Sequence, residues 1–300
     1  MNSISAVLDS HSQEDRLKAG SSQMPSDSRS LSSERDYEQL KREFFNNISH
    51  ELRTPINVLL GSIQLFEMMG DELFLEANRD KFFTYQRIMK QNCYRLLRLV
   101  NNLIDVSIMD SGYLSLFPEN NNLVLLAQDI TQKAMGYAEA KGLTLTFVTE
   151  EQEIITACDK EKIQRVLLNL LSNAIKFTPK GGKITVSLYQ DEKRVYLSVK
   201  DTGIGISEEK LNSIFERFQP EASTLTRNHE GSGIGLSLCS SIIRLHGGLI
   251  RVKSIPQQGS EFIIELPNRI IPSVSSTNQG RTELSFSSNE RVPIELSDLF

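Results

Sequence analysis

Two apolar seams with helical spacing occupy the first third of the chain after a polar start. The first follows steps of four and three residues through Phe45, Ser49, Leu52, Ile56, Leu59, Ile63 and Phe66. The second runs through Tyr85, Met89, Asn92, Leu96, Leu99, Leu103 and Val106, and ends near Ser111. This spacing predicts two amphipathic helices with coiled-coil or bundle packing. Gly70 and Asp71 separate them, and Pro55 predicts a kink in the first.

Two such helices joined by a short connection predict a helical hairpin. A single hairpin has little against which to bury its two stripes, so we expect two copies to form a dimeric four-helix bundle. An isolated hairpin packed on the C-terminal half of the same chain is the alternative.

The pattern becomes mixed after Pro118. We expect helices over 126–141, 160–177, 208–218 and 234–245, and strands over 123–124, 143–148, 154–158, 184–189, 195–199, 249–254 and 261–266. The strands over 184–189 and 195–199 alternate apolar and polar residues around a short turn, which indicates a hairpin. The expected fold is therefore α + α/β: the helical hairpin, followed by a mixed sheet with helices on one face.

These changes of pattern divide the chain into four parts. Residues 1–35 are polar and lack apolar periodicity, so we expect a disordered tail. The hairpin domain covers 36–114, the α/β domain 118–268, and a polar C-terminal tail 269–300. Within that tail, Arg291–Phe300 recovers some apolar alternation, which is consistent with docking on another part of the chain.

Composition adds only broad limits. The net charge is −5 and the pI near 5.6, which argues against a nucleic acid or an anionic membrane as partner. No apolar run approaches the roughly 20 residues that a membrane helix needs. Three widely spaced cysteines, Cys93, Cys158 and Cys239, fall in apolar patterns and are expected to be buried free thiols. A cytoplasmic protein is the interpretation that these observations favour.

The predicted helix over 160–177 carries two asparagines where apolar residues are expected. Asn169 and Asn173 lie one turn apart on the same face, and Lys176 follows one turn later. A buried amide is costly without partners, and its oxygen is a suitable ligand for Mg²⁺ together with phosphate oxygens. Two helical asparagines are, however, more often structural.

Two glycine-rich stretches follow. Asp201-Thr202-Gly203-Ile204-Gly205 comes directly after a strand, where glycines permit a tight turn and the carboxylate can accept a hydrogen bond from an amine. Gly231, Gly233, Gly235 and Leu236 open a predicted helix, whose exposed amides suit a phosphate. A polar loop rather than a strand precedes this second stretch, so a dinucleotide-binding motif is a poor fit.

His50 and Glu51 stand side by side at the edge of the first seam. Alone, this pair has no specific meaning. Five stretches in order do: 44–55, 169–179, 201–206, 214–218 and 231–238 resemble the H, N, G1, F and G2 boxes of sensor histidine kinases. The resemblance covers residues 36–267. It implies a HisKA-type dimerisation and phosphoacceptor hairpin, followed by a Bergerat-fold ATP-binding domain.

The resemblance also implies roles for individual residues. His50 would take the γ-phosphoryl group of ATP, with Glu51 as base, and Thr54 would help to dephosphorylate the partner. Asn173 would bind Mg²⁺, and Asp201 would accept a hydrogen bond from adenine. The remaining nucleotide-binding residues would be Asn169, Lys176, Phe177, Gly203, Gly205, Gly231, Gly233, Gly235 and Leu236.

The implied partners are a second copy of the chain and a separate response regulator, whose receiver aspartate takes the phosphoryl group from His50. Residues 219–230 would form a mobile lid over the nucleotide. A catalytically degenerate dimeric scaffold and a related-fold ATPase are the alternatives. The ATPase would need a carboxylate near Asn169 to activate water, and the scaffold would be expected to lack one of the five boxes.

Overall fold

The computed structural model describes residues 26–70, 78–111, 115–211, 213–216, 234–272 and 288–299. The part of the chain up to Phe45 forms one unit, and the part from Asn46 onward forms a second. Helix α1, Ser26–Met69, continues through Pro55 as one element, and helix α2 covers Arg79–Ser111. Helix α1 thus starts ten residues before the predicted hairpin domain, inside the stretch 1–35 that was expected to be disordered.

Aromatic side chains join α1 to α2 beside their connection. The ring of Phe66 stacks on that of Phe82 with centroids 5.7 Å apart, and it meets the edge of Tyr85 at 5.8 Å. Residues near the end of α1 therefore face residues near the start of α2, as in the predicted antiparallel hairpin.

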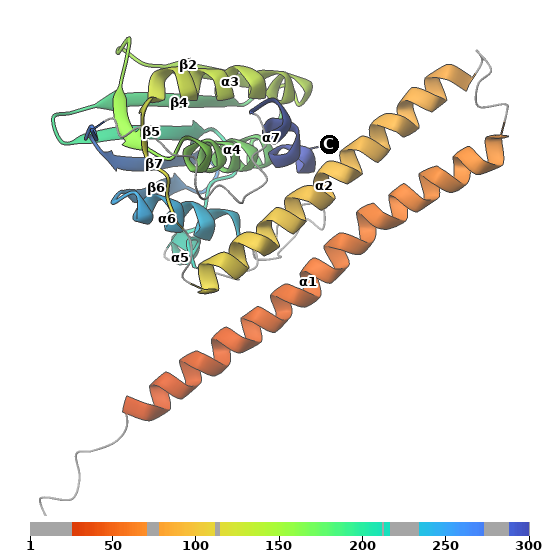
Figure 1. Ribbon diagram of the computed structural model, residues 1–300, viewed down its shortest axis with the longest axis horizontal. Coiled ribbons are helices and arrows are strands. Elements are labelled where there is room, and N and C mark those ends of the chain that lie inside the picture. The colour runs from red at the N-terminus through yellow and green to blue at the C-terminus, as the bar shows by residue number, and fades with distance from the viewer. Residues whose placement is uncertain are drawn as a thin grey trace, which may run out of the picture. The chain divides into compact units, whose positions relative to one another are not determined.

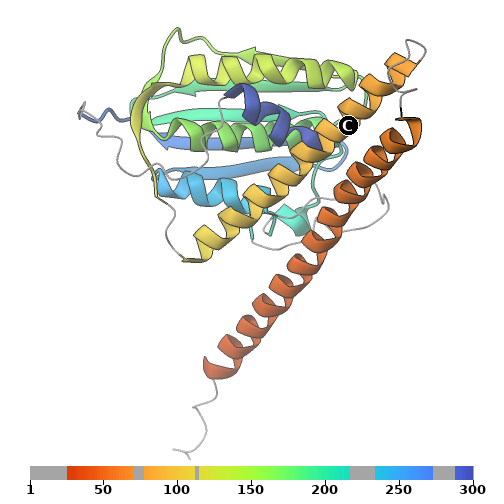
Figure 2. The ribbon, with the colours of Figure 1, turned by 45° about the vertical axis from the view of Figure 1, so that its right-hand side comes forward.

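The α/β part contains a five-stranded sheet in the order β2-β4-β5-β7-β6, in which only β2 and β4 pair in parallel. Helices α3, α4 and α6 lie on one face of this sheet (Figures 1 and 2). The sheet strands are β2 Thr144–Val148, β4 Lys183–Gln190, β5 Arg194–Asp201, β6 Leu249–Ile255 and β7 Gly259–Pro267. The helices are α3 Leu123–Ala140, α4 Lys160–Phe177, α5 Glu208–Leu211 and α6 Gly235–Leu245.

Alternation along the strands explains why the helices cover one face. In β4, Ile184, Val186 and Leu188 are fully buried, whereas Thr185 and Ser187 between them are half-buried. Leu167, Leu171 and Ile175 of α4 are also fully buried and supply the apolar side of that helix. The predicted mixed sheet with helices on one face is confirmed.

One element was assigned wrongly from the sequence. Residues 123 and 124 begin α3 rather than form a strand, because the Asn122 side chain accepts hydrogen bonds from the Val124 and Leu125 amides and caps the helix. The strand before it is the polar β1, Glu119–Asn122, which pairs antiparallel with β3, Ile155–Cys158.

Two smaller expectations also differ from the structure. Helix α5 ends at Leu211, with turns at residues 213–215, so the helix expected over 208–218 is shorter than predicted. Cys93 is exposed on α2, whereas Cys158 and Cys239 are buried as expected. Beyond β7, helix α7 covers Ser288–Glu295, and a 3-10 turn, η3, covers Ser297–Leu299.

Candidate nucleotide site and phosphoacceptor histidine

Helix α4 carries the two asparagines in the middle of the α/β part. The Asp159 side chain caps its start by accepting a hydrogen bond from the Lys162 amide at 3.1 Å. Asn169 is buried, with 6% of its surface exposed, and Asn173 is half-buried one turn later. Neither amide makes a hydrogen bond within the described residues. Amides without a protein partner on the inner side of this helix are available to a ligand, as the sequence predicted.

The first residue of α6 lies against this pair. A Cβ at Gly235 would collide with Asn169 Nδ2, so the glycine lets α6 approach α4 without displacing the Asn169 amide. Leu236 follows, half-buried. Gly231 and Gly233, and the lid expected over 219–230, lie outside the described residues.

Asp201 ends β5 and is buried, with 7% of its surface exposed. Its Oδ1 accepts hydrogen bonds from the amides of Gly203, at 2.8 Å, and Ser260, at 3.3 Å. Burial raises the pKa of this carboxyl group, and the two amide hydrogen bonds oppose that shift. Because both bonds go to Oδ1, Oδ2 keeps its accepting capacity for a ligand amine.

The DTGIG loop packs tightly between the end of α4 and β6. The Ile204 amide donates to the Phe177 carbonyl at 3.3 Å, and a Cβ at Gly203 would lie 2.6 Å from the same oxygen. Gly205 has a φ of +66°, and a side chain there would collide with the Ile255 carbonyl. Both glycines are therefore required by close backbone contacts that hold Asp201 beside α4.

The end of α4 presents a cation and an aromatic ring. Lys176 Nζ lies 5.0 Å from the centroid of the Phe177 ring, and both residues are half-buried. Lys141, from the end of α3, donates to the carbonyls of Ile175 at 2.6 Å and Lys176 at 2.7 Å. These bonds satisfy carbonyls of the last turn of α4. The lysine was not identified from the sequence, although a basic residue beyond a helix end is a weak signal for this role.

The structure thus connects most of the predicted nucleotide residues through one set of contacts. Asp201, Gly203 and Gly205 meet the end of α4, and Gly235 meets its middle. Ser260 is a further contributor that no sequence pattern indicated. Of the F-box stretch, the Phe215 ring packs edge-on against Phe262 with centroids 6.4 Å apart.

The fit to ATP and Mg²⁺ follows from the donor set. Within the described ranges, no group of three His, Cys, Asp or Glu residues could hold a metal ion. A Mg²⁺ ion commonly has one or two protein ligands, with phosphate oxygens and water completing its octahedron. The unpaired amide of Asn173 fits that arrangement, and Lys176 offers a counter-charge for phosphate.

His50 lies on α1 in an exposed position. Its neighbours Ile48 and Pro55 are buried, whereas Thr54 is exposed and its Oγ1 donates to the His50 carbonyl at 3.4 Å. Glu51 is half-buried beside it. Within the described ranges, the His50 side chain makes no hydrogen bond, so its imidazole is open to a reactant.

Comparisons with known proteins agree with this arrangement. Residues 40–112 match the His Kinase A (phospho-acceptor) domain, and residues 158–270 match the histidine kinase-, DNA gyrase B- and HSP90-like ATPase domain. The chain therefore has the two domains of a sensor histidine kinase and belongs to that family.

Individual histidine kinases and sensor proteins are similar to this chain over most of its length. Over 76% of this chain, histidine kinase P4 of Formosa agariphila is 35% identical, and over 80%, sensor protein SrrB of Staphylococcus aureus is 36% identical. The chain spans 16% and 40% of the lengths of these relatives. A crystal structure of full-length ShkA in complex with AMPPNP matches 79% of this chain and 47% of that one, with a TM-score of 0.56 and 25% identity.

Among the residues that the structure describes, no helix has the length and apolar character needed to cross a membrane.

Proposed function

We propose that this chain binds Mg²⁺-ATP on α4 and the DTGIG loop, phosphorylates itself on His50, and passes the phosphoryl group to an aspartate of a separate response regulator. The side-chain amides of Asn169 and Asn173, which make no hydrogen bond within the described residues, support this most directly. Asn169 lies beside Gly235, and both asparagines lie on the helix whose end packs against the Asp201 loop.

The nucleotide would be held by three kinds of group. Asp201 Oδ2 would accept a hydrogen bond from the exocyclic amine of adenine, and the half-buried Phe177 ring would lie against the base. Asn173 would bind Mg²⁺, with Asn169 beside it and Lys176 directed at the phosphates. The metal, when bound, supplies charge neutralisation on the phosphate oxygens, which is the main requirement of phosphoryl transfer.

At His50, an imidazole nitrogen would form the new N–P bond while the bond from the γ-phosphorus to the β,γ-bridging oxygen breaks and ADP leaves. Glu51 would accept the imidazole proton, so that the attacking nitrogen keeps its lone pair. Thr54, one turn further along α1, would position water for dephosphorylation of the regulator. This second activity rests on the Glu51-x-x-Thr54 spacing and the exposure of Thr54.

A homodimer through the hairpin is the form that the exposed apolar residues favour. Several large side chains on α1 and α2 stay at least 40% exposed in the single chain, namely Ile56, Leu60, Ile63, Val100 and Ile104. A second copy packing along the same helices would bury them.

The decisive experiment is labelling with [γ-³²P]ATP of the chain and of its His50→Gln variant. The chain should acquire an acid-labile, base-stable label, and His50→Gln should acquire none. Asn57→Gln, two turns further along the exposed side of α1, is the matched control and should label normally. Persistent label of the same lability on His50→Gln would exclude this histidine as the phosphoacceptor.

A further inference from the structure

The C-terminal segment 288–299, formed by α7 and η3, is not a free tail. Its apolar side chains Val292, Ile294 and Leu296 are buried, with 3%, 2% and 0% of their surfaces exposed. The segment contacts α2 of the hairpin and both α3 and α4 of the ATP-binding part. It lies beyond both regions that match the family domains, which end at residues 112 and 270.

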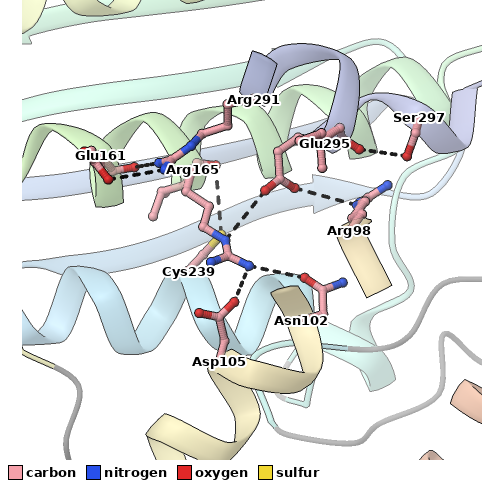
Figure 3. Close-up of polar contacts among 11 residues, drawn as sticks. Arg98, Asn102, Asp105, Glu161, Arg165, Cys239, Arg291, Glu295 and Ser297 are labelled. Atoms are coloured by element: carbon pink, nitrogen blue, oxygen red, sulfur yellow. Dashed lines mark hydrogen bonds and ion pairs between the residues drawn. The ribbon is translucent and has the colours of Figure 1, made fainter. Parts of the chain in front are cut away.

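Arg165 of α4 is the centre of the polar contacts under this segment (Figure 3). It forms an ion pair with Asp105 of α2, approaches Asn102 of α2 at 3.4 Å, and reaches Glu295 Oε1 of α7 at 3.6 Å. Burial lowers the pKa of Arg165, but the charges of Glu295 and Asp105 outweigh it and raise the pKa overall. One guanidinium therefore joins the hairpin, the ATP-binding part and the C-terminal segment.

Two arginines of α2 hold the segment from the other side. Arg98 forms an ion pair with Glu295 Oε2 at 3.7 Å (Figure 3). It forms a second ion pair with Asp298. Arg95 Nε donates to the Ser297 carbonyl at 3.1 Å. The carboxylate of Glu295 is thus shared between an arginine of α2 and an arginine of α4.

A further arginine ties the start of α7 to the start of α4. Arg291 donates to the Glu161 carbonyl at 2.8 Å and pairs with its carboxylate at 3.3 Å (Figure 3). The segment is consequently anchored to α4 at Glu161 and Arg165, one turn apart.

These anchors lie on the elements that carry or contact the functional groups. On α4, Arg165 is one turn before Asn169 and two turns before Asn173, on the same face of the helix. On the hairpin side, the anchors lie on α2, which contacts the His50-bearing helix α1 through Phe66, Phe82 and Tyr85.

We propose that the segment 288–299 is a cis-acting latch that fastens the ATP-binding domain to α2 and restrains autophosphorylation. This inference rests on the proposed function. The His50 imidazole must meet ATP in one step and the regulator aspartate in the next, and the two cannot occupy it together. The ATP-binding domain must therefore move relative to the hairpin during the cycle, and contacts shared by α2, α4 and α7 must break when it does.

Release of the latch should raise the autophosphorylation rate. Coupling between two states of a regulated protein is typically a factor of about 5 or more, so we expect at least a fivefold rise in the initial rate. Ile294→Asp in the full chain places a charge at a buried position of the segment 288–299 and should detach the segment from α2, α3 and α4. Ile270→Asp is the matched control, because Ile270 follows β7 and is 69% exposed, and its rate should stay at that of the unmodified chain.

A synthetic peptide of residues 288–299 adds a readout that general destabilisation would not produce. Added to Ile294→Asp, it should bind the vacated surface and lower the rate again, whereas a scrambled peptide should not. Should Ile294→Asp fail to fold by circular dichroism, Glu295→Gln keeps the volume while weakening both arginine pairs, and it should raise the rate at least twofold.

The outcomes separate the latch from the proposed function. An unchanged or reduced rate in the folded release variants, with label that still depends on His50, would overturn the latch alone. A faster rate that the peptide does not reverse would also overturn it. Loss of the His50 dependence would instead overturn the proposed phosphoacceptor.

Discussion

Removing Arg165 tests whether the charges under the C-terminal segment compensate one another. In Arg165→Met, Asp105 and Glu295 keep their buried positions, with side chains 5% and 6% exposed, but lose their shared cation. Breaking a buried ion pair by deleting one partner typically costs about 3–5 kcal/mol. Glu295 retains Arg98, so the loss falls mainly on Asp105, and we expect about 3 kcal/mol, the lower end of that range.

The assay is urea unfolding followed by circular dichroism at pH 7, at one fixed protein concentration because dimerisation would shift the midpoint. Burial already raises the pKa of Asp105 in the intact protein, against the charge of Arg165, and the variant should raise it further. A carboxyl group whose pKa is raised on folding favours the folded state at low pH, and that contribution is lost as pH rises from 3.8 through the folded pKa. The deficit of Arg165→Met should therefore shrink as the pH is lowered from 7 to about 5.

The matched control replaces both partners. Asp105→Leu combined with Arg165→Met should recover most of the lost stability, since an apolar pair in place of a buried ion pair is often neutral or stabilising. A loss below about 1 kcal/mol in the single variant, the level of an exposed pair, would refute the account of a compensated buried charge. So would a double variant as unstable as the single one.

Two further predictions concern the α/β part. Gly205→Ala should weaken ATP binding and cost about 1–3 kcal/mol of stability, because its φ of +66° and the nearby Ile255 carbonyl exclude a side chain. The control is Gly61→Ala, which has open space in α1 and should be neutral or slightly stabilising. Equal ATP affinities of Gly205→Ala and the unmodified chain in a titration would contradict the prediction. Burial lowers the pKa of His246 below its ordinary value of 6.5 in the folded protein. The neutral ring therefore stabilises the fold fully above pH 6.5, and this stabilisation is lost as the pH falls toward the folded pKa, because the unfolded chain then binds the proton more readily. Urea midpoints from pH 8 to 5.5 should therefore fall less steeply in His246→Gln, and an identical slope would show that this histidine does not cause the loss.

His246 directly follows the last residue of α6, a position where a protonated ring would suit the helix dipole. In the structure it does cap α6, but as a neutral ring: Nδ1 donates to the Ile242 carbonyl at 2.8 Å, and Nε2 accepts from the Asp159 amide at 3.0 Å. A protonated ring could not make the second bond. The charge state depended on a partner 87 residues away, which helix patterning cannot reveal.

The periodic spacing of apolar residues was sufficient to predict helices and strands that bury one face. Helix α4 was predicted with its observed ends, because Asp159 caps its start and Pro179 follows its end. The hairpin β4–β5 was likewise found from its alternation. Strand β1 was missed because its four residues are one glutamate and three asparagines, and only pairing with β3 makes it a strand.

The sequence by itself determined the chemistry of this protein: a histidine and glutamate on a bundle helix, and asparagine, aspartate and glycine motifs in the order of a histidine kinase. Local spacing is enough for such motifs, because helix and turn geometry places their members together. Only the tertiary structure decided where the C-terminal residues bind. Arg165 meets Asn102 across 63 residues of chain, and it meets Glu295 from the other direction. A buried charge is stable only with such partners, and the fold alone brings them within reach.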